Sequence, residues 1–244
     1  MKVILPCAGK GTRLGLPYPK ETHLIAKQTA LIDLTFKRLE NHADLIGEVI
    51  IVLAPEKASL VEYLAKWKEH FYLKFVYFDD RNHEWAGSIL SAEKEFGDKN
   101  LVFLPDTFLV GLPEFPIVPT FDAELEKNSV CFGYLPTEDR KTLRSLGALR
   151  VAKNQVQGFC DKPAEDDPEF FNAFWTTFGF TQKAARPLLE MMTQSIQRKP
   201  VNLGGVSSAV SAFPVKEYKD LGVWPNIVEF TKRLGENETP FPAF

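Results

Sequence analysis

The chain has 244 residues, 45% of them hydrophobic and 25% charged, and a formal net charge of −3 at pH 7. These values are typical of a globular protein with a large core, and they exclude a broad basic surface for nucleic acid. No apolar run approaches the length of a membrane span, and the apolar start of the chain is too short for a signal peptide. We therefore expect a cytoplasmic protein that binds neither nucleic acid nor a membrane.

The first hundred residues alternate between short apolar runs and amphipathic segments. The apolar runs predict strands at 2–6, 48–53, 74–78 and 101–104. The amphipathic segments predict helices at 31–40, 56–71 and 87–96. This alternation predicts an α/β fold with a Rossmann-like, doubly wound, mostly parallel mixed sheet. Ligands of such sheets bind beyond the carboxyl ends of the strands.

The pattern changes beyond residue 110. Three prolines predict a loop at 111–119, and an acidic turn is expected at 164–168. Shorter elements are predicted as strands at 130–135, 148–152, 156–159 and 211–215, and as helices at 182–197 and 224–233. Residues 170–180 are unusually aromatic, and we favour a core role for them over a shelf on which a ligand stacks.

The most informative stretch follows the first strand. It combines two glycines, a threonine hydroxyl and two cations in Ala8-Gly9-Lys10-Gly11-Thr12-Arg13-Leu14, followed by Pro19-Lys20. Glycines let backbone N–H groups approach a ligand closely, and consecutive N–H groups form an anion-binding concavity. Because Arg13 and Lys20 add two positive charges, the stretch predicts a phosphate site.

Two familiar phosphate-binding loops do not fit this spacing. The P-loop requires four residues between its first glycine and Gly-Lys-Ser/Thr, and here Gly9 and Gly11 are too close together. The dinucleotide fingerprint requires a third glycine where Leu14 stands. It also requires an acid about 20 residues further on, and Glu56 is too distant. These mismatches weigh against a nicotinamide-dependent oxidoreductase.

The loop and its Pro-Lys resemble the A-G-x-G-T-R-L signature of the sugar-phosphate nucleotidyltransferases (nucleoside-diphosphate-sugar pyrophosphorylases). The resemblance implies one domain over 1–244, with a nucleotide-binding half at 1–110 and a sugar-phosphate-binding half at 111–244. It implies an Mg²⁺-dependent enzyme that joins a nucleoside triphosphate, with UTP or dTTP favoured, to a sugar 1-phosphate and releases pyrophosphate. The alternatives are CTP or GTP with another phosphorylated sugar or alcohol, and a non-catalytic nucleotide-binding relative. A homo-oligomer is left open.

The same resemblance implies functional roles for residues throughout the chain. The expected catalytic cations are Arg13, Lys20 and Lys162. The expected nucleotide contacts are Ala8, Gly9, Lys10, Gly11, Thr12, Asn82 and Gly87. The expected sugar contacts are Gly147, Asp161 and Thr176. The expected metal ligands are Asp106 and Asp220.

Some of these assignments depart from the family pattern. Asp106 lies in Pro-Asp-Thr where relatives have Gly-Asp-Asn or Gly-Asp-Asp, and Asp161-Lys162 replaces Glu-Lys. Thr176 stands where many relatives have a sugar-side glycine, a departure that concerns the sugar and not the reaction. The amide of Asn82 offers a donor and an acceptor, which suits uracil or thymine.

The cysteines and histidines carry no metal signal. Cys7, Cys131 and Cys160 are scattered and odd in number, which indicates reduced, buried thiols. Cys7 ends the first apolar run, and we interpret it as a small core residue, not a nucleophile. The four histidines lack the spacing of metal ligands.

Overall fold

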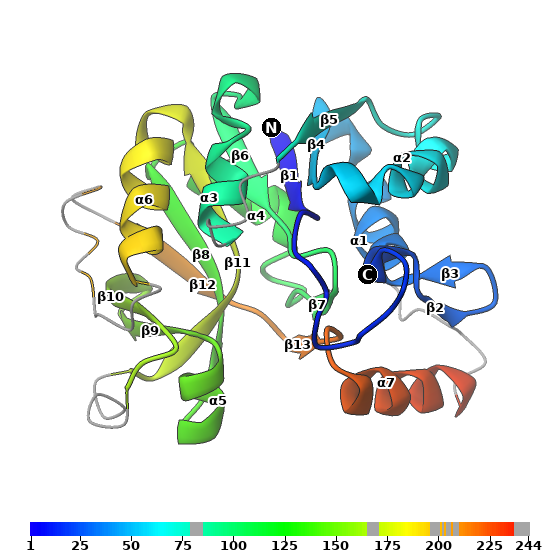
Figure 1. The fold of residues 1–244 in the computed structure, drawn as a ribbon. Helices are drawn as coiled ribbons and strands as arrows, with labels where there is room; N and C mark the ends of the chain where they lie inside the picture. Colours follow the sequence, from blue (N-terminus) through cyan, green and yellow to red (C-terminus); the bar gives the residue numbers. More distant parts are fainter. Residues whose placement is uncertain are drawn as a thin grey trace.

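The computed structural model describes residues 1–78, 85–164, 171–195 and 210–236, together with 201, 203 and 206. Within these residues a nine-stranded mixed sheet has the order β5-β4-β1-β6-β11-β8-β12-β10-β9 (Figure 1). Its strands are β1 (Lys2–Pro6), β4 (Glu48–Leu53), β5 (Leu73–Tyr77), β6 (Lys99–Val102), β8 (Val130–Pro136), β9 (Gly147–Ala152), β10 (Gln155–Asp161), β11 (Ala173–Thr181) and β12 (Val210–Pro214).

The sheet changes character along its width. Strands β5, β4, β1 and β6 are mutually parallel, as the alternating pattern predicted. Beyond β6 the pairs are antiparallel except for β8 with β12, so four pairs are parallel and five antiparallel in the described ranges. The prediction of a mostly parallel sheet is therefore wrong for the second half. One cause is the tight turn between β9 and β10, in which Lys153 and Asn154 have φ of 52° and 59°. A turn this short can join only antiparallel strands.

Helices cover both faces of the sheet. The alternating side chains of β1 show this, since Val3 and Leu5 lie in one hydrophobic cluster and Ile4 lies in another. The first cluster includes residues of α1 (Leu31–Glu40), α2 (Ser59–Tyr63) and α4 (Ile117–Glu124), and the second includes residues of α3 (Trp85–Leu90) and α6 (Gln182–Ser195). Figure 1 shows α3 and α6 on one side of β1 and α1 and α2 on the other. The α/β prediction is confirmed.

Several expected element bounds are corrected. The helix predicted at 56–71 is only the short α2, between two 3-10 turns at Pro55–Lys57 and Leu64–Trp67. The helix predicted at 87–96 begins earlier, at Trp85, and ends at Leu90. The loop expected at 111–119 contains the start of α4, because Pro119 lies in the first helical turn, where a missing N–H is tolerated. Residues 165–168 of the expected acidic turn lie outside the described residues.

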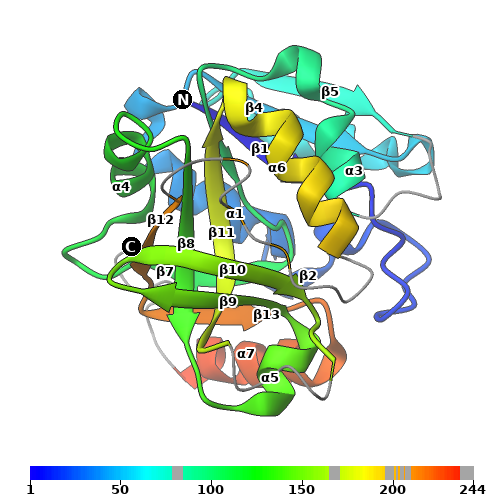
Figure 2. The ribbon, with the colours of Figure 1, turned by 90° about the vertical axis from the view of Figure 1, so that its left-hand side faces the viewer.

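Two small sheets and two further helices complete the fold. Strand β2 (Leu24–Ala26) pairs with β3 (Thr29–Ala30), and β7 (Thr107–Val110) pairs with β13 (Glu217–Asp220). The β9–β10 hairpin crosses β8 and β11 in Figure 2, with α5 (Arg140–Ser145) and α7 (Trp224–Glu236) at the same end of the molecule. Within the described ranges no helix has the length and apolar character needed to cross a membrane.

Candidate active site

A cavity of about 890 Å³ opens at the carboxyl ends of the parallel strands. Its wall includes Pro6 at the end of β1, Ala54 just after β4, Phe78 just after β5 and Leu104 just after β6. This is the edge at which the sheet topology predicted a ligand site. The cavity also reaches the β9–β10 side of the molecule, so residues far apart in the sequence face one another across it.

The glycine loop forms one wall of this cavity. Ala8, Gly9, Lys10, Thr12 and Arg13 all line it. The loop is anchored at its far end, because Leu14 is buried against α7 and its carbonyl accepts a 2.9 Å hydrogen bond from the Trp224 indole. Gly11 itself does not line the cavity. Its φ of 66° lies in the left-handed region, so its role is to turn the loop.

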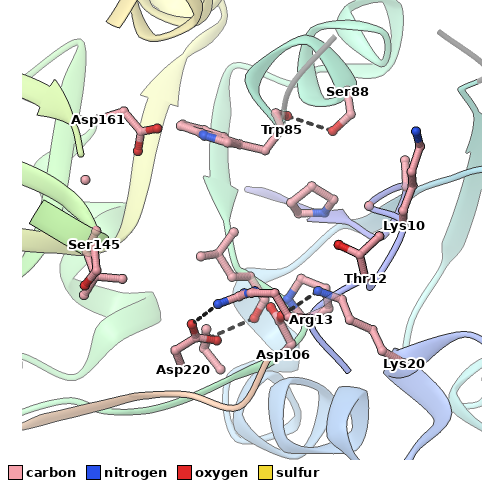
Figure 3. A pocket seen from close by; sticks show the side chains of 18 of the residues that line it. Lys10, Thr12, Arg13, Lys20, Trp85, Ser88, Asp106, Ser145, Asp161 and Asp220 are labelled. Carbon is pink, nitrogen blue, oxygen red and sulfur yellow. Dashed lines mark hydrogen bonds and ion pairs between the residues drawn. The ribbon is translucent and has the colours of Figure 1, made fainter. Parts of the chain in front are cut away.

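Two carboxylates meet the two loop cations at one end of the cavity. Lys20 Nζ lies 2.5 Å from Asp106 Oδ2, and Arg13 Nη1 lies 2.6 Å from Asp220 Oδ2. Figure 3 shows these four side chains gathered together. The register of β7 with β13 explains the meeting, because Asp220 is opposite Thr107, the residue that follows Asp106.

Gly222 makes this arrangement possible. A Cβ on Gly222 would lie 2.5 Å from Arg13 Nη2, 2.7 Å from Asp106 Oδ2 and 2.9 Å from Asp220 Oδ1. Both carboxylates therefore approach the same bare Cα. The Gly222 N–H also donates to Asp220 Oδ1 at 2.7 Å, which fixes that carboxylate.

Both cations keep their charge in this setting. Burial alone would lower the pKa of Lys20, but the carboxylates of Asp106 and Glu21 outweigh it and raise that pKa. Burial likewise acts to lower the pKa of Arg13, and the hydrogen bond and charge of Asp220 raise it. The loop thus presents two permanent positive charges at physiological pH.

A buried ion pair supports the loop from beneath, and sequence analysis missed it. Lys57 Nζ lies 2.9 and 3.0 Å from the two carboxylate oxygens of Glu21 and donates to the Cys7 carbonyl at 2.7 Å. Glu21 is completely buried and Lys57 is 6% exposed. The pair ties the segment that carries Lys20 to the start of the glycine loop.

The prediction that the three cysteines are buried, unpaired thiols is confirmed. All three cysteines are buried and unpaired. Burial raises the pKa of the Cys7 thiol well above its usual value, which is contrary to what a nucleophile requires.

The opposite wall comes from the second half of the chain. Asp161 and Ser145 lie across the cavity from Lys10 and Thr12 in Figure 3, and Gly147 and Lys162 line the same wall. Asp161 is paired with Gly147 in the β10–β9 register. Lys162 has a φ of 51°, an uncommon conformation for a residue with a side chain and one that is enriched at functional sites. Its N–H donates to the Leu146 carbonyl at 3.1 Å, which holds this turn in place.

Besides Gly11, two expected contacts do not line the cavity, and a third falls outside the described residues. Thr176 is buried and donates through Oγ1 to the Gly133 carbonyl at 3.0 Å, so it does not reach the cavity. A register shift in β11 next to Thr176 accounts for this, and Trp175 lines the cavity in its place. Gly87 lies within α3 away from the wall, where Trp85 and Ser88 take its place. Asn82 lies outside the described residues.

The donor chemistry at Asp106 and Asp220 fits Mg²⁺. Both offer carboxylate oxygens, and both converge on Gly222. Mg²⁺ is bound through oxygen, keeps several waters, and takes one or two protein carboxylates at nucleotide sites. In the part of the chain that the structure describes, no group of three or more His, Cys, Asp or Glu side chains could hold a metal ion, so Asp106 and Asp220 would supply two protein ligands and no more.

Comparison with known proteins places the fold. The sequence matches no protein-family model and no curated protein. A UDP-glucose pyrophosphorylase complexed with UDP-glucose superposes with a TM-score of 0.75 at 18% identity, over 96% of this chain and 98% of that one. A Bacillus anthracis protein described as a glucose-1-phosphate thymidylyltransferase, in complex with sucrose, superposes with a TM-score of 0.74 at 17% identity, over 99% of this chain and 96% of that one. This chain has the sugar-phosphate nucleotidyltransferase fold. HddC from Yersinia pseudotuberculosis, complexed with GMP-PN, shares this fold with a TM-score of 0.68 at 16% identity, over 96% of this chain and 99% of that one.

Proposed function

We propose that the chain is a nucleotidyltransferase that joins a nucleoside triphosphate to the phosphate of a phosphorylated sugar or related alcohol and releases pyrophosphate. The observation that carries this proposal is the convergence of Arg13, Lys20, Asp106 and Asp220 at one end of a cavity whose other wall holds Lys162. Phosphoryl-type transfer needs little covalent help from the protein, and it depends on positioning and on neutralising charge. These residues are suited to both tasks.

The residues on the two facing walls of the cavity would bind different substrates. Arg13, Lys20 and the N–H groups near Gly9 would hold the triphosphate on the glycine-loop wall. Lys162 on the opposite wall would hold the acceptor phosphate, and Asp161 would accept a hydrogen bond from an acceptor hydroxyl. Two anions held on facing walls can meet in line, which is the geometry that attack on the α-phosphorus requires. UTP or dTTP remains the favoured donor, and CTP or GTP the alternative.

A charge count supports a role for a divalent cation. The described side chains that line the cavity comprise equal numbers of basic and acidic residues, namely Lys10, Arg13, Lys20, Lys162, Glu56, Asp106, Asp161 and Asp220. A cavity with no net charge does not by itself offset a triphosphate. Mg²⁺ held by Asp106 and Asp220 would supply the missing positive charge and stabilise the leaving pyrophosphate. The proposed enzyme is therefore Mg²⁺-dependent.

The test is pyrophosphate release from the purified full chain. Each of UTP, dTTP, CTP and GTP is incubated with Mg²⁺ and a panel of phosphorylated sugars and alcohols, and release is compared with and without acceptor. We expect acceptor-dependent release with one triphosphate and its loss in Lys20→Met. Lys219→Met is the matched control, because Lys219 forms an ion pair with Glu229 and does not line the cavity. Release that needs no acceptor, or none with any pair, would refute the proposal.

A further inference from the structure

The wall opposite the glycine loop contains one large aromatic side chain, Trp175, which packs over Gly147. Trp175 is only 7% exposed and lines the cavity beside Gly147. A Cβ on Gly147 would lie 1.8 Å from Trp175 Nε1. The indole therefore occupies the space that the missing side chain of Gly147 leaves free. Gly147, an expected sugar contact, lines the cavity, but its missing side chain leaves room for the Trp175 indole and not for a ligand.

Packing, not hydrogen bonding, holds this indole in place. The Trp175 ring lies 5.2 Å from the Trp85 ring and 5.5 Å from the Phe178 ring between centroids. Its Nε1 is buried and has no hydrogen-bond partner among the described residues. A buried N–H without an acceptor is costly, so the contacts with the neighbouring rings and Gly147 must outweigh that cost. The indole is a fixed part of the wall.

The polar groups on this wall are few. The described side chains that could hydrogen-bond an acceptor near this wall are Ser145, Asp161 and Tyr218, beside Lys162 for its phosphate. A hexose 1-phosphate carries several further hydroxyls, and each one that is buried without a partner weakens binding. A largely buried indole and three polar side chains suit a smaller molecule with few polar groups.

We infer that Trp175 limits the acceptor to short phosphorylated alcohols, smaller than a hexose, and is the specificity-determining residue of this wall. This inference rests on the proposed nucleotidyltransferase function and narrows its acceptor class. Trp175 acts by occupying volume over Gly147, so it excludes a hexose ring without contacting the reacting phosphates.

The experiment compares acceptors for the purified full chain, with the triphosphate that it uses. The short acceptors are glycerol 3-phosphate and phosphoethanolamine, and the hexoses are glucose 1-phosphate and mannose 1-phosphate. We expect kcat/KM for a short acceptor to exceed that for either hexose by at least about tenfold, the scale on which a pocket rejects a group too large for it. Trp175→Val should raise the hexose value about tenfold or more relative to the short acceptor. Trp67→Val is the matched control, since Trp67 is also 7% exposed but lies away from the cavity.

The outcomes separate this inference from the function on which it rests. A wild-type chain that uses a hexose 1-phosphate as well as a short acceptor overturns the inference and leaves the proposed function standing. A chain that releases no pyrophosphate with any pair overturns both. Because the wild-type comparison is decisive by itself, the test does not depend on Trp175→Val folding, and a triphosphate-induced rise in melting temperature shows whether that variant keeps its donor site.

Discussion

Removing Lys57 should destabilise the protein strongly, because it leaves a buried charge unpaired. Both oxygens of Glu21 bind Lys57 Nζ, at 2.9 and 3.0 Å, and Glu21 is completely buried. Breaking a buried pair by removing one partner costs about 3–5 kcal/mol. For a chain of this size about 2–4 °C is lost per kcal/mol, so Lys57→Met should lower the melting temperature by roughly 6–20 °C.

The double variant Glu21→Leu/Lys57→Met tests the reasoning itself. Replacing both charges with apolar side chains removes the unpaired carboxylate, so stability should return to within about 1 kcal/mol of wild type or exceed it. Lys74→Met is the control, because the half-exposed pair of Lys74 with Glu95 at 3.3 Å should contribute no more than about 1 kcal/mol. Urea unfolding followed by circular dichroism measures all three. A Lys57→Met variant no less stable than Lys74→Met would refute the argument.

Three further substitutions or treatments test the site. Asp106→Asn should lower turnover by about 10²-fold or more, which is the scale for losing one electrostatic group at a reacting centre. A loss of less than tenfold would show that Asp106 is not a metal ligand. Gly222→Ala should abolish most activity while the chain stays folded, because its Cβ would approach both carboxylates and Arg13 within 3 Å; unchanged kinetics would contradict the described packing. Because burial raises the pKa of the Cys7 thiol, a thiol reagent at pH 8 should label Cys7 only after unfolding, as peptide mapping would show.

The first half of the fold was predictable from sequence because its elements carry their own signals. Strand β4 is buried at every position and apolar after Glu48, and α1 repeats its apolar residues at helical spacing, so the bounds of both are as predicted. The glycine loop was predictable for a similar reason, since its chemistry depends on residue types within one short stretch. Prediction succeeded where structure depends on neighbours in sequence.

The parts that sequence analysis missed depend on contacts between distant residues. Strand β13 is half-buried at all four positions, so it has no alternating pattern and was not predicted, although the family resemblance named Asp220 beside Asp106 as a metal ligand. The Glu21–Lys57 pair joins segments 36 residues apart. In the aromatic stretch, the register shift next to Thr176 turns Trp175 toward the cavity, and period-two reasoning cannot anticipate such a shift.

The paired state of the loop cations predicts that triphosphate and Mg²⁺ bind cooperatively. In the structure Lys20 pairs with Asp106, and Arg13 pairs with Asp220. A triphosphate competes for the cations and releases the carboxylates, while a divalent cation competes for the carboxylates and releases the cations. Each ligand therefore prepares the site for the other, and the coupling must be reciprocal, with a typical size of about 1–3 kcal/mol or 5–150-fold in affinity.

Calorimetric titration measures this coupling in both directions. The dissociation constant of the preferred triphosphate is determined with and without Mg²⁺. The Mg²⁺ that the free nucleotide binds in solution is measured separately and subtracted. Asp220→Asn should reduce the coupling between triphosphate and Mg²⁺ binding, because it removes the ion pair of Arg13 with Asp220 and leaves that of Lys20 with Asp106. Triphosphate affinity that does not depend on the metal would show that the cations and carboxylates act independently, and the charge argument for a metal at this site would then fail.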